Sequence, residues 1–137
     1  MKERGKNLRI LHLALGGCLK SPPIAFGITA DTGGHIAYVI DAAQAQAALP
    51  GVTAVSIVTR LIEDARLGPA YARPREPLTA NVTIDRIATA DRRYLEKEAL
   101  GADLPGFTAA FLDHLAALPH LAKWAWITSG RCGSRAR

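Results

Sequence analysis

The sequence predicts an α/β fold with a parallel sheet. Two apolar runs, LRILHLAL at residues 8–15 and VTAVSIVTRL at residues 52–61, have the length and composition of buried strands. Between them, apolar residues recur at steps of three and four through residues 34–49, which is typical of a helix that buries one face. A strand, a helix and a second strand in this order form a unit with parallel strands and a right-handed crossover.

Glycines and prolines mark where these elements end. The first strand stops at Gly16-Gly17, and a loop containing Pro22-Pro23 follows it. The helix begins at Gly34 and stops before Pro50-Gly51. Residues 62–80 contain one glycine and three prolines, so we expect an irregular excursion with a short helical turn.

The remaining residues continue the α/β pattern. The run NVTIDRIA at residues 81–88 predicts a third strand, and residues 91–100 are expected to form a loop with a short helix. From Phe107 to Leu118 the apolar spacing predicts a second amphipathic helix, with Pro105-Gly106 as its N-terminal boundary.

Composition excludes several classes of protein. At 137 residues with 49% hydrophobic residues, the chain has the size and core of one globular domain. It has no apolar run of about 18 residues, so we expect no membrane partner. The basic N-terminus precedes an apolar run that His12 interrupts, and the run is interpreted as a strand rather than a signal peptide. The two cysteines, Cys18 and Cys132, are consistent with a reducing, cytoplasmic setting.

The basic character of the chain does not indicate nucleic-acid binding. Although the isoelectric point is about 9.6, four of the five net positive charges lie in residues 123–137, which contain no acid. Residues 1–122 therefore carry a net charge of +1, with basic and acidic side chains interleaved. No aromatic and basic platform is present, so we expect no nucleic-acid partner.

The histidines and carboxylates show no metal-ligand spacing, and we expect neither a metal nor a cofactor. His12 lies within a predicted strand and His114 on the apolar face of a predicted helix, so both are expected to pack. Asp31 is expected to cap a helix or shape a loop, and no residue is assigned a catalytic role.

Two adjacent glycines, Gly33 and Gly34, stand at the start of the first predicted helix. Glycine inside a helix costs about 1 kcal/mol relative to alanine, so the pair needs a reason. One interpretation is that a phosphate or sugar oxygen approaches the unpaired N–H groups of the helix, where a Cβ would obstruct it. The other is that Asp31 or Thr32 caps the helix and the glycines only shape the turn. The spacing fits neither the dinucleotide fingerprint nor the P-loop.

The wider context of the glycines resembles a known family. The segment from Ala30 to Val52, with D-T-G-G at its start and Y-V in its helix, is followed by a strand ending T-R at Arg60. The later run DRIATADRRYLEKE at residues 85–98 is similar to a segment R-I-P-x-G-x-x-x-x-Y-x-x-K-E. These motifs, over roughly residues 8–121, resemble the N-terminal domain of sucrose-phosphate synthases and sucrose synthases. These are retaining glycosyltransferases of the GT-B fold, with two Rossmann-like domains.

The resemblance implies roles for five residues. Gly33 and Gly34 match a glycine loop that faces the substrate cleft, and His35 stands where the family usually has a glutamine that contacts the acceptor sugar. Arg86 and Lys97 match basic positions near the acceptor's phosphate. The alternative for these two cations is ordinary surface pairing with Asp85 and Glu98.

The resemblance also implies a domain organisation and a function. Residues 1–122 are expected to be an incomplete, acceptor-side glycosyltransferase domain, and residues 123–137 an atypical basic tail, for which an out-of-frame translation is our hypothesis. The tail stands where relatives continue into a strand and an H-x-H loop. The whole enzyme would transfer glucose from UDP-glucose to fructose 6-phosphate in sucrose biosynthesis, and the isolated chain is expected to be inactive. The alternative is a non-catalytic module that binds sugar phosphates and is completed by a separate C-terminal donor domain.

Overall fold

The computed structural model describes residues 7–118 and the backbone of residues 124–128. The elements are, in chain order, β1 (Leu8–Leu13), α1 (Gly34–Ala47), β2 (Val52–Arg60), the 3-10 helix η1 (Pro69–Ala72), β3 (Arg75–Pro77), β4 (Val82–Ile87), the 3-10 helix η2 (Lys97–Ala99), α2 (Leu100–Ala116) and β5 (Trp124–Thr128).

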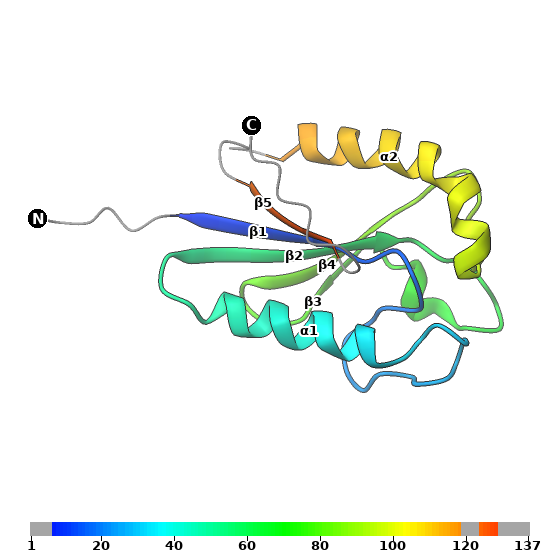
Figure 1. The fold of residues 1–137 in the computed structure, drawn as a ribbon, viewed down its shortest axis with the longest axis horizontal. Coiled ribbons are helices and arrows are strands. Elements are labelled where there is room, and N and C mark those ends of the chain that lie inside the picture. Colours follow the sequence, from blue (N-terminus) through cyan, green and yellow to red (C-terminus); the bar gives the residue numbers. More distant parts are fainter. Residues whose placement is uncertain (1–6, 119–123, 129–137) are drawn as a thin grey trace, which may run out of the picture.

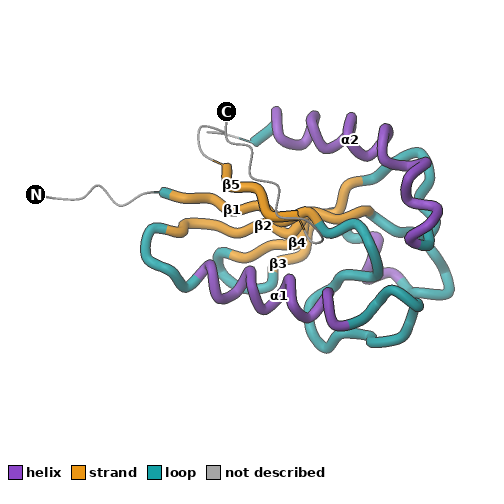
Figure 2. Tube along the Cα trace, in the orientation of Figure 1, coloured by secondary structure: helices purple, strands orange, loops and turns teal. Residues whose placement is uncertain are grey.

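One sheet with the strand order β3-β4-β2-β1-β5 forms the centre of the described structure. Strands β4, β2, β1 and β5 run parallel to one another, and β3 pairs antiparallel with β4. Helix α1 lies on one face of the sheet and α2 on the other (Figure 1). The loops that follow β1, β2 and β4 gather at one end of the sheet (Figure 2), which is the carboxyl edge where open α/β sheets bind ligands.

The two-residue period of the strands divides the core into two layers. In β1, Ile10 faces the cluster that includes Ile36 and Ile40 of α1, whereas the adjacent Leu11 faces the cluster beneath α2. In β2 and β4, too, some buried side chains belong to the cluster beneath α1 and others to the cluster beneath α2. On the α2 side the core contains Phe107 and Phe111, whose stacked rings have centroids 6.1 Å apart. Burying each phenylalanine contributes about 1.5–3 kcal/mol, which fixes α2 against the sheet.

Most of the predicted elements are confirmed. The strands predicted at residues 8–15, 52–61 and 81–88 and the helix predicted at 34–49 occur within one or two residues of those bounds. Strands β1 and β2 are parallel, as the β-α-β pattern predicts. The short helical turn expected in residues 62–80 is η1.

The predicted start of the second long helix is wrong. Helix α2 begins at Leu100 and contains Pro105, although Pro105-Gly106 predicts the N-terminal boundary of this helix. A proline inside a helix costs about 3 kcal/mol because it removes one backbone hydrogen bond. Here Asp103, in the first turn, forms an ion pair with the buried Arg60 at 2.6 Å, which anchors the helix ahead of the proline.

Two edge strands were not predicted. Strand β3 is three residues long and contains Pro77, which is compatible with an edge position. The backbone of Trp124–Thr128 pairs with β1 as β5, inside the segment that we assigned to an atypical tail. The remainder of that segment, including Cys132, lies outside the described residues. No helix in the described part of the chain is long and apolar enough to cross a membrane.

Candidate functional site

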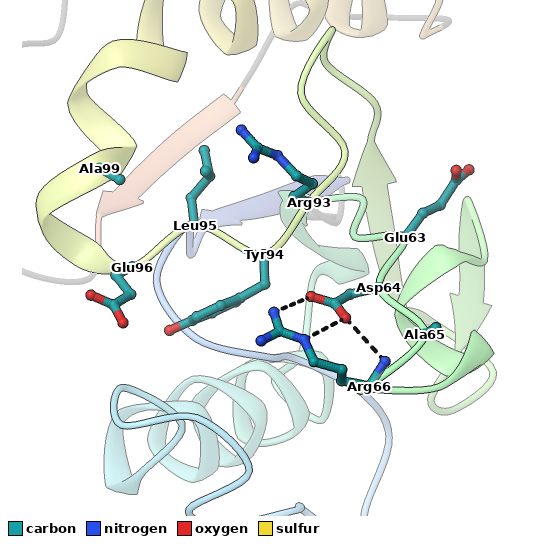
Figure 3. A pocket seen from close by; sticks show the side chains of 9 residues that line it. All are labelled: Glu63, Asp64, Ala65, Arg66, Arg93, Tyr94, Leu95, Glu96 and Ala99. Atoms are coloured by element: carbon teal, nitrogen blue, oxygen red, sulfur yellow. Dashed lines mark hydrogen bonds and ion pairs between the residues drawn. The ribbon is translucent and has the colours of Figure 1, made fainter.

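A crevice of about 540 Å³ opens at the carboxyl edge of the sheet. Its walls come from the loop after β2 and from the loop between β4 and α2 (Figure 3). The lining residues are Glu63, Asp64, Ala65, Arg66, Arg93, Tyr94, Leu95, Glu96 and Ala99. They present carboxylates, guanidinium groups and one aromatic ring, which can hydrogen-bond and pack against a polyhydroxylated ligand.

Two arginines of the crevice are held by carboxylates two residues earlier in the chain. Asp64 accepts hydrogen bonds from the backbone N–H and the Nε of Arg66, both at 3.0 Å, and Asp91 binds Arg93 in the same way at 3.1 and 3.0 Å. These bonds lower the pKa of each aspartate to about 2. The two guanidinium groups are therefore already partly neutralised and oriented before any ligand arrives.

The glycines at the start of α1 face open space. A Cβ added to Gly33 or Gly34 would meet no atom within 4 Å, and neither residue has a positive φ. Gly17 is different, since its φ is +79° and a Cβ there would lie 2.6 Å from the carbonyl oxygen of Asp31. The fold therefore requires glycine at position 17, whereas the described structure gives no internal reason for it at positions 33 and 34.

The alternative prediction, that Asp31 or Thr32 caps helix α1, is wrong. Gly33 is the N-cap residue of α1, and among the described residues no side chain donates or accepts a capping hydrogen bond there. Instead, Thr32 accepts a hydrogen bond from the backbone N–H of Cys18 at 2.9 Å, and Asp31 accepts one from the N–H of Gly17 at 3.2 Å. Both side chains tie the segment before α1 to residues 17 and 18, in the loop that follows β1. The first N–H groups of α1 are left without a side-chain partner in the described structure.

Tyr94 joins the glycine loop, residues 31–34 at the start of α1, to the crevice. Its hydroxyl donates a hydrogen bond to Oδ1 of Asp31, and Thr29 donates to the same oxygen at 2.7 Å. Partial burial raises the pKa of Asp31, but the hydrogen bonds from Tyr94, Thr29 and Gly17 outweigh burial and lower it overall. Tyr94 lies within the family-like run at residues 85–98, but the motif predicts no role for it. Its contact with Asp31 spans 63 positions in the chain, so no local pattern could have shown it.

Of the predicted site residues, Gly33, Gly34 and His35 lie together. The side chain of His35 is exposed, and its Nε2 lies 3.2 Å from the carbonyl oxygen of Gly16, in the loop after β1. Lys97 is exposed at the start of η2, next to the lining residue Glu96.

Arg86 lies apart from this group. Its side chain is buried, donates to the carbonyl oxygens of Leu19 at 2.8 Å and Arg73 at 3.0 Å, and forms an ion pair with Glu76 at 3.2 Å. Arg86 therefore makes neither the predicted surface pair with Asp85 nor a described contact with the crevice. Its role at a phosphate stays a prediction.

Arg60, the last residue of β2, supports the site, and the sequence predicts no role for it. Besides Asp103, it binds the carbonyl oxygens of Asp91 and, at 3.2 Å, of Arg93. One buried side chain at the end of β2 therefore fixes the loop that carries Tyr94. The T-R motif at the end of this strand is the sequence feature that could have indicated this role of Arg60.

His12 and His114 both pack against neighbouring side chains, as the sequence predicts. His12 is 3% exposed, and its Nε2 lies 2.6 Å from Oε1 of Gln46. His114 is half-buried, with Nε2 3.9 Å from Oδ2 of Asp85. Within the described residues no group of three or more His, Cys, Asp or Glu side chains could hold a metal ion.

The Tyr94–Asp31 contact predicts a loss of stability at alkaline pH. Burial and the hydrogen bond to Asp31 raise the pKa of Tyr94 from 10.0 to about 12. Because folding favours the protonated phenol, its contribution is complete below pH 10.0 and is lost as the pH rises towards 12. In urea unfolding, the stability difference between the wild type and Tyr94→Phe is expected to shrink over this range. A difference that stays constant with pH would contradict this contact.

Comparison with known proteins places these features in a family context. The chain is 30% identical over 128 residues to a probable sucrose-phosphate synthase from Solanum tuberosum, and 32% identical over 127 residues to probable sucrose-phosphate synthase 1 from Oryza sativa subsp. indica. Each match covers 83% of this chain and 12% of the relative, so the chain spans about an eighth of their length. No family model matches.

A solved structure shows the same fold. The structure of sucrose-phosphate synthase from Thermosynechococcus elongatus superposes with a TM-score of 0.57 at 18% identity, covering 81% of this chain and 25% of that one. The predicted α/β fold and the resemblance to the N-terminal part of sucrose-phosphate synthases are both confirmed.

Proposed function

We propose that this chain, which resembles the N-terminal part of sucrose-phosphate synthases, forms the acceptor side of a glycosyltransferase and binds a sugar phosphate at the carboxyl edge of its sheet. The whole enzyme would transfer glucose from a nucleotide sugar, UDP-glucose, to fructose 6-phosphate. The observation that carries the proposal is the open space over Gly33 and Gly34, which the hydrogen bond from Tyr94 to Asp31 connects to a crevice lined with hydrogen-bonding groups.

The start of α1 is the part of the surface best suited to a sugar oxygen or phosphate. A helix N-terminus carries a partial positive charge and N–H groups that point outward. The glycines leave this end of the helix uncovered, and the exposed ring of His35 can supply a further hydrogen bond. These features favour a ligand that lies across Gly33 and Gly34 and extends into the crevice.

Lys97 is the proposed contact for the phosphate group. Its ammonium is exposed, and within the described part of the chain no carboxylate forms an ion pair with it, in contrast to Arg66 and Arg93. A charge-assisted hydrogen bond is worth about 1.5–3 kcal/mol, or roughly a tenfold to hundredfold change in affinity. Arg86 would act indirectly, by fixing the loop after β1 through the carbonyl oxygen of Leu19.

The proposal is tested by adding ligands to the 137-residue chain and following its thermal unfolding. Fructose 6-phosphate is expected to raise the melting temperature in a concentration-dependent way, and fructose is expected to do so more weakly. Lys97→Gln should weaken binding of fructose 6-phosphate about tenfold or more and leave fructose binding unchanged. Adding UDP-glucose is expected to release no UDP, because the matched segment is a small part of the whole enzymes.

Arg75→Gln is the matched control for Lys97→Gln. Arg75 is a cation whose side chain is 74% exposed, on the edge strand β3 and 3.9 Å from Asp85, whereas Lys97 adjoins the lining residue Glu96. Loss of Arg75 should therefore leave the affinity unchanged. Equal weakening by both variants would show a general charge effect. No response of the wild type to fructose 6-phosphate at millimolar concentration would refute sugar-phosphate binding, and release of UDP would refute the inactivity of the chain.

A further inference from the structure

Tyr94 belongs to two parts of the proposed binding surface. Its ring lines the crevice, where its side chain and that of Arg93 leave the loop in opposite directions (Figure 3). Its hydroxyl bonds Asp31, two residues before Gly33. The other described donors to the Asp31 side chain, Gly17 and Thr29, belong to the segment between β1 and α1. Tyr94 comes from the distant loop between β4 and α2.

Asp31 in turn helps to hold the glycine loop in place. Its Oδ2 accepts from the N–H of Gly17 and its Oδ1 from the hydroxyls of Thr29 and Tyr94. A carboxylate that accepts several hydrogen bonds is held in one orientation, and so is the backbone that carries it. The start of α1 has no side-chain cap of its own in the described structure. The hydrogen bonds of Asp31 and of Thr32, just before the helix, therefore hold the start of α1 in place.

The loop that carries Tyr94 is itself fixed to the sheet. Arg60, 3% exposed at the end of β2, binds the carbonyl oxygens of Asp91 and Arg93, one residue before Tyr94. The ring of Tyr94 also packs beside the buried cluster of Cys18, Ile62 and Tyr71. Tyr94 thus extends from a rigid base to the glycine loop.

We propose that Tyr94 is a positioning residue that acts through Asp31 to hold Gly33 and Gly34 at the distance from the crevice that a bound sugar phosphate requires. The inference rests on the proposed function for the identity of the ligand. The tether itself, from Tyr94 through Asp31 to the glycine loop, can be measured without any ligand.

The test compares Tyr94→Phe with Tyr71→Phe in the 137-residue chain. Both variants remove one phenolic oxygen from neighbouring rings, but the hydroxyl of Tyr71 has no hydrogen-bond partner among the described residues. Amide hydrogen exchange is measured first, without ligand, and the affinity for fructose 6-phosphate second. In Tyr94→Phe, exchange at the hydrogen-bonded amides of Gly17, Thr32 and Ile36 is expected to be about tenfold faster or more, with core strand amides unchanged. The affinity should fall about tenfold, and Tyr71→Phe should show neither effect.

Each outcome separates the positioning role from the proposed function. Unchanged exchange around the glycine loop, or faster exchange spread evenly over the sheet, would overturn the tether. Faster local exchange with unchanged affinity would overturn the role of Tyr94 in ligand binding. If the wild type binds no sugar phosphate, the proposed function fails, and a local change in exchange would still support the tether between Tyr94 and the glycine loop.

Discussion

Replacing Arg86 with methionine is expected to lower the free energy of unfolding by about 3 kcal/mol, because the buried Glu76 loses its nearer, buried cation and keeps the exposed Arg73, 3.9 Å away. Arg86 is 5% exposed and Glu76 is 4% exposed. Glu76 also accepts a hydrogen bond from the N–H of Ser21 at 2.5 Å. Burial raises the pKa of Glu76, but its hydrogen bonds from Ser21 and the charge of Arg86 outweigh burial and lower the pKa overall, so the carboxylate is ionised at neutral pH.

Urea unfolding of matched variants tests this expectation. Arg75→Met removes an arginine whose side chain is 74% exposed, 3.9 Å from Asp85, and should cost less than about 1 kcal/mol. The double variant Arg86→Met with Glu76→Leu should be more stable than Arg86→Met alone, since it removes both charges. If Arg86→Met is no less stable than Arg75→Met, the buried pair does not stabilise the fold.

Replacing Gly17 with alanine is expected to destabilise the chain by about 2 kcal/mol or more. A residue with a Cβ at a φ of +79° costs roughly 1–2 kcal/mol. The added atom would also lie 2.6 Å from a backbone oxygen of Asp31, which cannot rotate away as a side chain could. The glycine loop would have to move to accommodate it.

The neighbouring glycines provide controls for Gly17→Ala. A Cβ at Gly16 meets no atom within 4 Å, and Gly16 has no positive φ, so Gly16→Ala should change the midpoint of unfolding little. Gly34→Ala should leave stability unchanged or raise it by up to about 1 kcal/mol, since alanine favours the helix.

If a ligand occupies the space over α1, Gly34→Ala should nevertheless weaken fructose 6-phosphate binding. Equal stability of Gly16→Ala and Gly17→Ala would refute the strain at Gly17.

The candidate site was predictable in part. The sequence indicated the glycine loop, because adjacent glycines at a helix start are costly and their surroundings resemble a family motif. It did not distinguish Arg86 from Lys97, although the first is buried and the second exposed. Both are cations in one short segment, and the burial of Arg86 depends on Leu19, Arg73 and Glu76, which lie elsewhere in the chain.

The sequence by itself determined the β-α-β unit of β1, α1 and β2 and the positions of β4 and most of α2 in the chain. This is possible because a helix repeats every 3.6 residues and a strand every two, and each pattern is written locally in the chain. Tertiary structure alone decided that Pro105 lies inside α2, that Gly17 rather than Gly33 is sterically required, and that Tyr94 reaches Asp31. Each of these depends on contacts between residues from 14 to 63 positions apart, such as Gly17 with Asp31 and Tyr94 with Asp31. Local patterns do not encode such contacts, because they form only when the sheet brings its loops together at one edge.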